Sequence, residues 1–204
     1  MRGESFDFIS NFSTLWQVML GACLATAGGL VANQFEWRIQ EQRKERNAAL
    51  FFGEVLSTVA VVLKLAHRTK QIGDPFGPVT LRMLRAVRRE IEIYERNRES
   101  LIHLRDAGLR ANIHQLTLRL AMPIDGLFDT SQEIASLEGQ LKSRTLDATD
   151  REEIEARVAE LKERRDGVYE YILERSVEIN GVLSGLGPLA RHTFDVEAYA
   201  VRTG

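Results

Sequence analysis

Residues 14–35 read TLWQVMLGACLATAGGLVANQF, a stretch without a charged side chain. As an α-helix it is long enough to cross a hydrocarbon core of ~30 Å. Trp16 and Trp37 stand near its two ends, separated by roughly 31 Å of helical rise, and indole rings prefer the two membrane interfaces. We therefore predict one transmembrane helix over 14–35, with Trp16 and Trp37 at the membrane interface. The alternative is that both tryptophans pack in a protein core.

The residues on either side of this helix set its expected orientation. Residues 1–13 carry Arg2 against Glu4 and Asp7, so they lack the basic beginning of a cleaved signal peptide, and we expect an uncleaved anchor. Four basic residues follow the helix and are candidates for contact with lipid headgroups: Arg38, Arg43, Lys44 and Arg46. By the positive-inside rule, the N-terminus lies outside and the C-terminal domain lies in the cytoplasm.

Small and amide side chains recur along one side of the predicted membrane helix. The candidate packing face consists of Gln17, Gly21, Ala25, Gly28, Gly29 and Asn33. Small residues allow close approach of two helices, and amides can hydrogen-bond across the interface. One interpretation is a homo-oligomer, or docking against another membrane-protein subunit. The other is that glycine and alanine are common in membrane helices, and both interpretations stay open.

The chain after the membrane helix changes character twice. Residues 36–47 are polar on nearly all sides and are predicted to form a charged juxtamembrane stalk. Residues 48–66 are apolar except for a narrow stripe that includes Glu54 and Lys64. Such a helix is either the central member of a bundle or a second membrane span. We favour the bundle, because charged side chains inside a membrane are costly.

The remaining pattern predicts an all-α fold. The turn GDPFGP at 73–78 is followed by a helix over about 79–106, and the next helix, about 109–143, is expected to bend or break near Pro123. A last long helix is predicted from an N-cap at Thr149 to about Ser184. Short connections favour antiparallel neighbours. We expect the membrane helix to continue into the stalk and an antiparallel up-down helical bundle over 48–186. The bundle ends in a long C-terminal helical hairpin, and a tail over 187–204 follows it.

Composition and motifs argue against several classes of function. The net charge of −2 does not favour a nucleic-acid partner, and Cys23 has no second cysteine for a disulfide or a thiolate metal site. The four histidines do not follow a glutamate by three residues, so the di-iron bundle motif is absent: His67, His103, His114 and His192. We found neither phosphate-binding glycine spacing nor a nucleophile elbow. We therefore predict no catalytic residue, no cofactor and no metal site.

One basic cluster precedes a run of glutamates. It consists of Arg82, Arg85, Arg88 and Arg89. Arg88 with Glu92, and Glu92 with Arg96, have the i,i+4 spacing of helical ion pairs, so we interpret this cluster as a solvated helix face.

The order of parts resembles a loose set of uncharacterised bacterial inner-membrane proteins. These have one N-terminal span, a charged stalk, an apolar helix and a helical domain with a central tyrosine and asparagine, here Tyr94 and Asn97 in IEIYERNRESLIHL. The resemblance implies a single-pass protein of the bacterial inner (plasma) membrane, with the bilayer as partner, and it implies no activity. The chain is also similar to the four-helix sensory domains of bacterial chemoreceptors, but it lacks their second span and signalling domain. The leading hypothesis is a non-enzymatic scaffold or accessory subunit, and the alternative is a sensory module.

Overall fold

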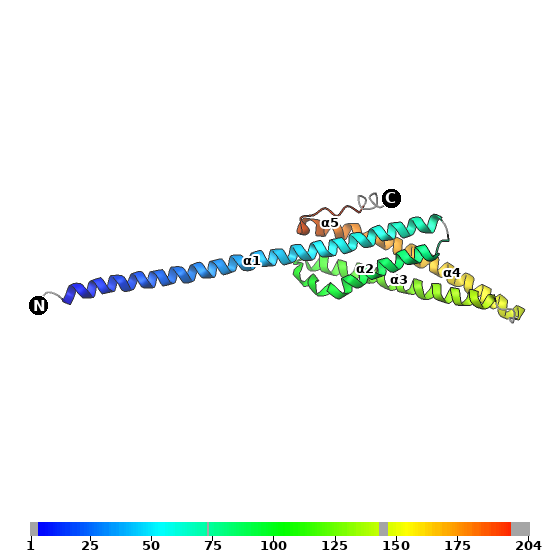
Figure 1. The fold of residues 1–204 in the computed structure, drawn as a ribbon, viewed down its shortest axis with the longest axis horizontal. Helices are drawn as coiled ribbons and strands as arrows, with labels where there is room; N and C mark the ends of the chain where they lie inside the picture. The colour runs from blue at the N-terminus through cyan, green and yellow to red at the C-terminus, as the bar shows by residue number, and fades with distance from the viewer. Residues whose placement is uncertain (1–3, 73, 143–146, 197–204) are drawn as a thin grey trace. The chain divides into compact units, whose positions relative to one another are not determined.

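The structure is a computed structural model that describes residues 4–72, 74–142 and 147–196, and its regular structure in those ranges is entirely helical. Within these ranges there are five α-helices, and a short 3-10 helix, η1, joins α2 to α3; the α-helices are labelled in Figure 1. Their bounds are α1 Glu4–Ile72, α2 Pro78–Asn97, η1 Arg98–His103, α3 Ala107–Leu141, α4 Ala148–Ser176 and α5 Glu178–Ala190. The predicted all-α class is confirmed.

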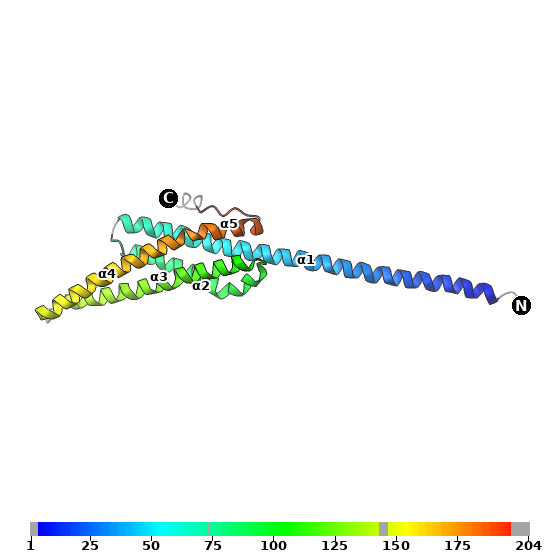
Figure 2. The same cartoon turned by 180° about the vertical axis from the view of Figure 1, so that it is seen from behind.

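The chain divides into two compact units, Met1–Lys44 and Glu45–Gly204. In the second unit, the later part of α1, α2, α3 and the consecutive pair α4–α5 lie side by side as antiparallel neighbours (Figures 1 and 2). A side-chain contact joins each pair of neighbouring helices. Phe52 of α1 contacts Tyr94 of α2, and Arg88 of α2 contacts Asp125 of α3. Glu133 of α3 pairs with Arg157 of α4, and Lys70 of α1 pairs with Asp166 of α4. This arrangement is the predicted up-down bundle.

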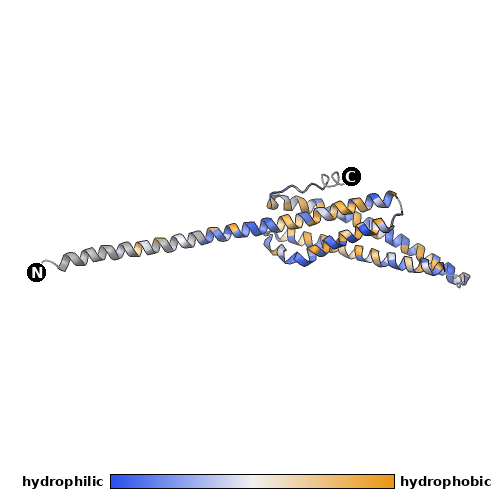
Figure 3. Ribbon diagram, in the orientation of Figure 1, coloured by the Kyte–Doolittle hydropathy of each residue, from blue (hydrophilic) through white to orange (hydrophobic). Residues whose placement is uncertain are grey.

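The apolar helix 48–66 is one of the packed members of that bundle, and one face of it lies in the shared core. Phe52, Val59 and Leu63 are each at most 1% exposed and belong to the main hydrophobic core. By length and composition, one described helical stretch, Asn33–Ile72, could cross a membrane, but 56% of its most apolar window is buried inside the structure. Figure 3 shows apolar residues distributed over all the helices of the bundle, as expected for a shared core. The burial supports the bundle interpretation of 48–66 over a second span.

Helices α3 and α4 form the predicted C-terminal hairpin. Beyond the main core they share a second apolar cluster around Ile134, Val158 and Leu161. Interhelical ion pairs flank this cluster: Arg157 with Glu133 at 3.1 Å and Lys162 with Glu138 at 2.7 Å. Alternation of apolar and charged positions along both helices therefore sets their register.

Two predicted helix boundaries in the middle of the chain differ from the structure. Helix α2 ends at Asn97 and passes into η1, and Gly108 lies in the first turn of α3, where Asp106 is the N-cap and accepts a hydrogen bond from the Leu109 amide at 3.0 Å. Helix α3 also continues through Pro123, because buried residues before and after it hold one face of the helix against the core.

The C-terminal boundaries differ as well. Asp147 caps α4 in place of Thr149, and the last helix is interrupted at Val177. Helix α5 then continues to Ala190, into the region predicted as tail. After α5, Phe194 packs on the core and Val196 is buried. The rest of the predicted tail, residues 197–204, lies outside the described residues.

Candidate membrane-contacting surface

The described part of α1 before Lys44 exposes large apolar side chains. Each is between 53% and 65% exposed: Trp16, Met19, Leu20, Leu24, Phe35 and Trp37. Water-soluble proteins seldom expose large contiguous apolar surfaces unless a partner or a lipid phase covers them. Trp16 and Trp37, the predicted interface markers, are thus both free of a protein core within the described residues.

The predicted packing face lies on this same part of α1. Gly21, Gly28 and Gly29 have open space where a Cβ would stand, and Asn33 is exposed. The side chains of residues 17 and 25 lie outside the described ones. At the described positions, the face therefore has room for a second helix.

The four predicted headgroup contacts divide into two groups. Arg38, Arg43 and Lys44 are exposed. Arg46 is also exposed, but its Nε donates a hydrogen bond at 3.3 Å to the carbonyl of Ala190. A cation at a helix C-terminus satisfies an unpaired carbonyl and interacts favourably with the helix dipole. This role could not be read from sequence, because the two residues are 144 positions apart.

Sequence reasoning also missed a polar and aromatic cluster where α1, the turn before α2, and α4 meet. Lys70 Nζ lies 3.0 Å from Asp166 Oδ1 and 3.4 Å from Glu170 Oε1, and it stands over the rings of Phe76 and Tyr169 at 5.1 and 4.4 Å. Ion pairing and cation–π attraction together hold the turn against α4. The one available signal was the i,i+4 spacing of Asp166 and Glu170, which places two carboxylates on one helix face.

Tyr169 at the centre of this cluster is fully buried, and its hydroxyl has no hydrogen-bond partner in the described part of the chain. Burial, reinforced by the negative charge of Glu170, raises the pKa of Tyr169 to about 12. The phenol is therefore neutral at physiological pH. Its chemistry is that of a packed ring, without an activated oxygen.

This raised pKa predicts a loss of stability at high pH. Above pH ~10 the unfolded chain releases the phenol proton while the folded chain keeps it, so stability present below pH ~10 declines as the pH rises towards the folded-state pKa. The variant Tyr169→Phe lacks this titrating group. We expect its free energy of unfolding, minus that of wild type, to increase by about 1 kcal/mol between pH 8 and pH 11. Chemical denaturation at both pH values measures this difference, and an unchanged difference would contradict the assigned burial of the phenol.

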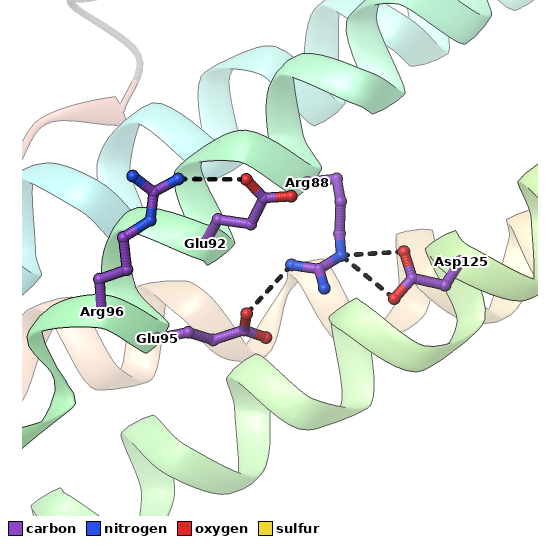
Figure 4. A network of polar contacts seen from close by, with 5 residues as sticks. All are labelled: Arg88, Glu92, Glu95, Arg96 and Asp125. Atoms are coloured by element: carbon purple, nitrogen blue, oxygen red, sulfur yellow. Dashed lines mark hydrogen bonds and ion pairs between the residues drawn. The ribbon is translucent and has the colours of Figure 1, made fainter.

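The arginine cluster on α2 is partly an interhelical contact (Figure 4). Arg88 Nε lies 2.8 Å from Asp125 Oδ1 on α3, and Arg88 Nη1 lies 3.4 Å from Glu95. The predicted pair of Glu92 with Arg96 is present at 3.4 Å, whereas Arg88 pairs with Asp125 and Glu95. The i,i+4 spacing predicted that Arg88 pairs with Glu92, but its guanidinium pairs with Asp125 on the facing helix instead.

The histidines are separated, and two of them have single polar contacts. His114 Nδ1 lies 3.1 Å from the Tyr94 hydroxyl, and His67 Nε2 lies 2.9 Å from the Gln71 amide. His103 and His192 are exposed. Among the described residues, no three histidine, cysteine or acidic side chains are grouped closely enough to hold a metal ion.

The polar clusters of the bundle are contacts between its own helices. The candidate functional surface is therefore the exposed apolar part of α1 before Lys44. Comparisons of the chain with protein families, curated proteins and solved structures found no match.

Proposed function

We propose that this protein is a non-enzymatic, membrane-anchored scaffold or accessory subunit. In this proposal, residues 14–35 cross a bacterial inner membrane and the helical bundle lies in the cytoplasm. The observation that carries it is the contrast along α1. The six large apolar side chains named above are more than half exposed before Lys44, and those of 48–66 are largely buried in the bundle. Within the described residues these side chains are exposed, and an apolar surface of this kind needs a lipid or protein cover.

The assembly role rests on the glycine face. Gly21, Gly28 and Gly29 leave open space at the helix surface, which permits close approach of another membrane helix. The partner is either a second copy of this chain or a different membrane-protein subunit. The basic residues Arg38, Arg43 and Lys44 then lie at the cytoplasmic headgroups.

Anchoring and orientation are tested together by labelling with a membrane-impermeant maleimide. Single cysteines are placed at Ser5→Cys and Asp150→Cys in a Cys23→Ala background. We expect the protein to stay in the membrane after an alkaline carbonate wash, position 5 to react from outside, and position 150 to react only after permeabilisation. If the carbonate wash releases the protein from the membrane, the proposed transmembrane anchor is wrong. Reaction at 150 from outside places the bundle outside and favours the sensory alternative.

Assembly is tested on the full chain purified in mild detergent. We expect a mass above that of the 23.1 kDa monomer, or specific co-purifying membrane proteins. Substituting Gly28→Leu should weaken this association, because a large side chain separates the two backbones. The matched control, Leu24→Ala, lies outside the predicted face and should have little effect. A monomer that captures no partner would contradict the scaffold proposal.

A further inference from the structure

Three segments of the bundle meet at the end where the chain enters it. The Arg105 amide donates to Glu45 Oε1 at 3.1 Å, and its guanidinium lies 3.6 Å from Glu45 Oε2. On the other side, Arg46 bonds to Ala190 at the C-terminus of α5. The start of the bundle part of α1, the η1 corner and the end of α5 therefore share one end, as Figures 1 and 2 show. We call residues 45–46, 98–110 and 187–192 the bundle base.

The bundle base is rich in arginine. Its charged residues are Arg46, Arg98, Arg105, Arg110 and Arg191 against Glu45, Glu99 and Asp106. Two of the three carboxylates are engaged locally, since Glu45 binds Arg105 and Asp106 caps α3. The other end of the bundle, at the start of α4 in the α3–α4 hairpin, is acidic. Residues 147–160 there contain six carboxylates and two arginines, and we call them the hairpin end. The chain's small net charge therefore conceals a bundle with a basic end and an acidic end.

The bundle base also carries an exposed apolar side chain. Ile102 on η1 is 77% exposed, whereas its neighbours Leu101 and Leu104 are buried in the main core. Arg98 and His103, on the same short segment, are exposed too. An exposed apolar side chain on the same segment as the exposed Arg98 matches an anionic lipid interface, where phosphates neutralise the arginines and the apolar group enters the acyl boundary.

We propose that the bundle base binds the anionic headgroups of the membrane in which the chain is anchored, with Arg98 and Arg191 on lipid phosphates and Ile102 in the interface. The inference rests on the proposed membrane span at 14–35. Residues 36–44 join that span to Glu45, and so short a segment can extend at most roughly 32 Å. The chain itself therefore tethers the bundle base within that distance of the span, whatever the orientation of the bundle.

The test uses the full chain reconstituted into lipid vesicles, with an environment-sensitive fluorophore at Ile102→Cys in the Cys23→Ala background. The vesicles contain either phosphatidylcholine alone or phosphatidylcholine mixed with phosphatidylglycerol, each with a shallow spin-labelled lipid as quencher. We expect a blue-shifted emission and quenching in the anionic vesicles, both reduced in neutral vesicles and in high salt. The matched control label at Glu153→Cys, at the acidic end, should be unquenched in both.

A charge variant separates headgroup binding from simple proximity. Arg98→Glu combined with Arg191→Glu should abolish the quenching at position 102, whereas Arg151→Glu at the hairpin end should preserve it. Circular dichroism confirms that each variant keeps its helices. If the protein floats with the vesicles but position 102 is unquenched, or is quenched equally without anionic lipid, the inference is overturned and the anchor stands. If the protein does not float with the vesicles, both the headgroup binding and the proposed anchor at 14–35 are wrong.

Discussion

Phe52→Ala is expected to lower the free energy of unfolding of the bundle by about 3–5 kcal/mol. The Phe52 ring is fully buried and packs edge-to-face on Phe51 at 5.2 Å and on Tyr94 of α2 at 5.8 Å. Removing it loses apolar burial and two aromatic contacts, and it leaves a cavity between α1 and α2. Urea unfolding of the full chain in mild detergent, followed by far-ultraviolet circular dichroism, measures the loss.

Phe51→Ala is the matched control, because it removes the same ring from the adjacent, half-buried position. We expect its cost to be clearly smaller, since part of that ring already contacts water. The comparison also decides between the two interpretations of 48–66. If this helix crossed a bilayer, the two substitutions would have similar small effects on unfolding, and the assignment of Phe52 to the bundle core would be wrong.

Gly53→Ala is expected to destabilise the bundle by about 1–3 kcal/mol, although alanine is the better helix former. A Cβ at Gly53 would overlap the ring of Phe194, which packs directly on this part of α1. Alanine therefore forces the ring out of its place or strains the helix. Loosening of the segment after α5 should appear as faster proteolysis at Arg191, alongside the lower unfolding free energy.

A double-mutant cycle makes the Gly53 prediction specific. In a Phe194→Ala background the overlapping ring is gone, so Gly53→Ala should stabilise the bundle by about 0.5–1 kcal/mol, the ordinary gain in a helix interior. The control is Gly126→Ala on α3, where open space surrounds the added methyl group and the same gain is expected without a second change. The same sign for Gly53→Ala in both backgrounds would show that Phe194 does not dock there.

Much of the fold was predictable because it depends on local patterns. The apolar run 48–66 and the turn at 73–78 indicate a helix face and a helix end from neighbouring residues. Boundaries were harder to place. Pro123 was expected to bend or break its helix, and the helix is not broken there, because packing on both sides keeps α3 continuous. Tertiary packing there outweighs one missing hydrogen bond.

The surfaces proposed to contact the membrane depend partly on amino-acid order and partly on tertiary packing. The exposed surface of α1 before Lys44 follows from amino-acid order. Its apolar character, its glycines and its basic border follow from the order of residues, because they are properties of a single helix. The bundle base does not follow from that order. Arg46 with Ala190, and Glu45 with Arg105, are far apart in the chain and come together only when the helices pack.

Amino-acid order alone was enough to determine the helical class, the long uncharged stretch at 14–35 and the apolar helix 48–66 of the bundle, since hydrophobic periodicity and the absence of charge are local. Which side chains meet was decided by packing. Phe194 on Gly53, Lys70 between Phe76 and Tyr169, and the gathering of arginines at one end depend on helix register and on where η1 and α5 end. Those positions follow from how all the helices fill one core together.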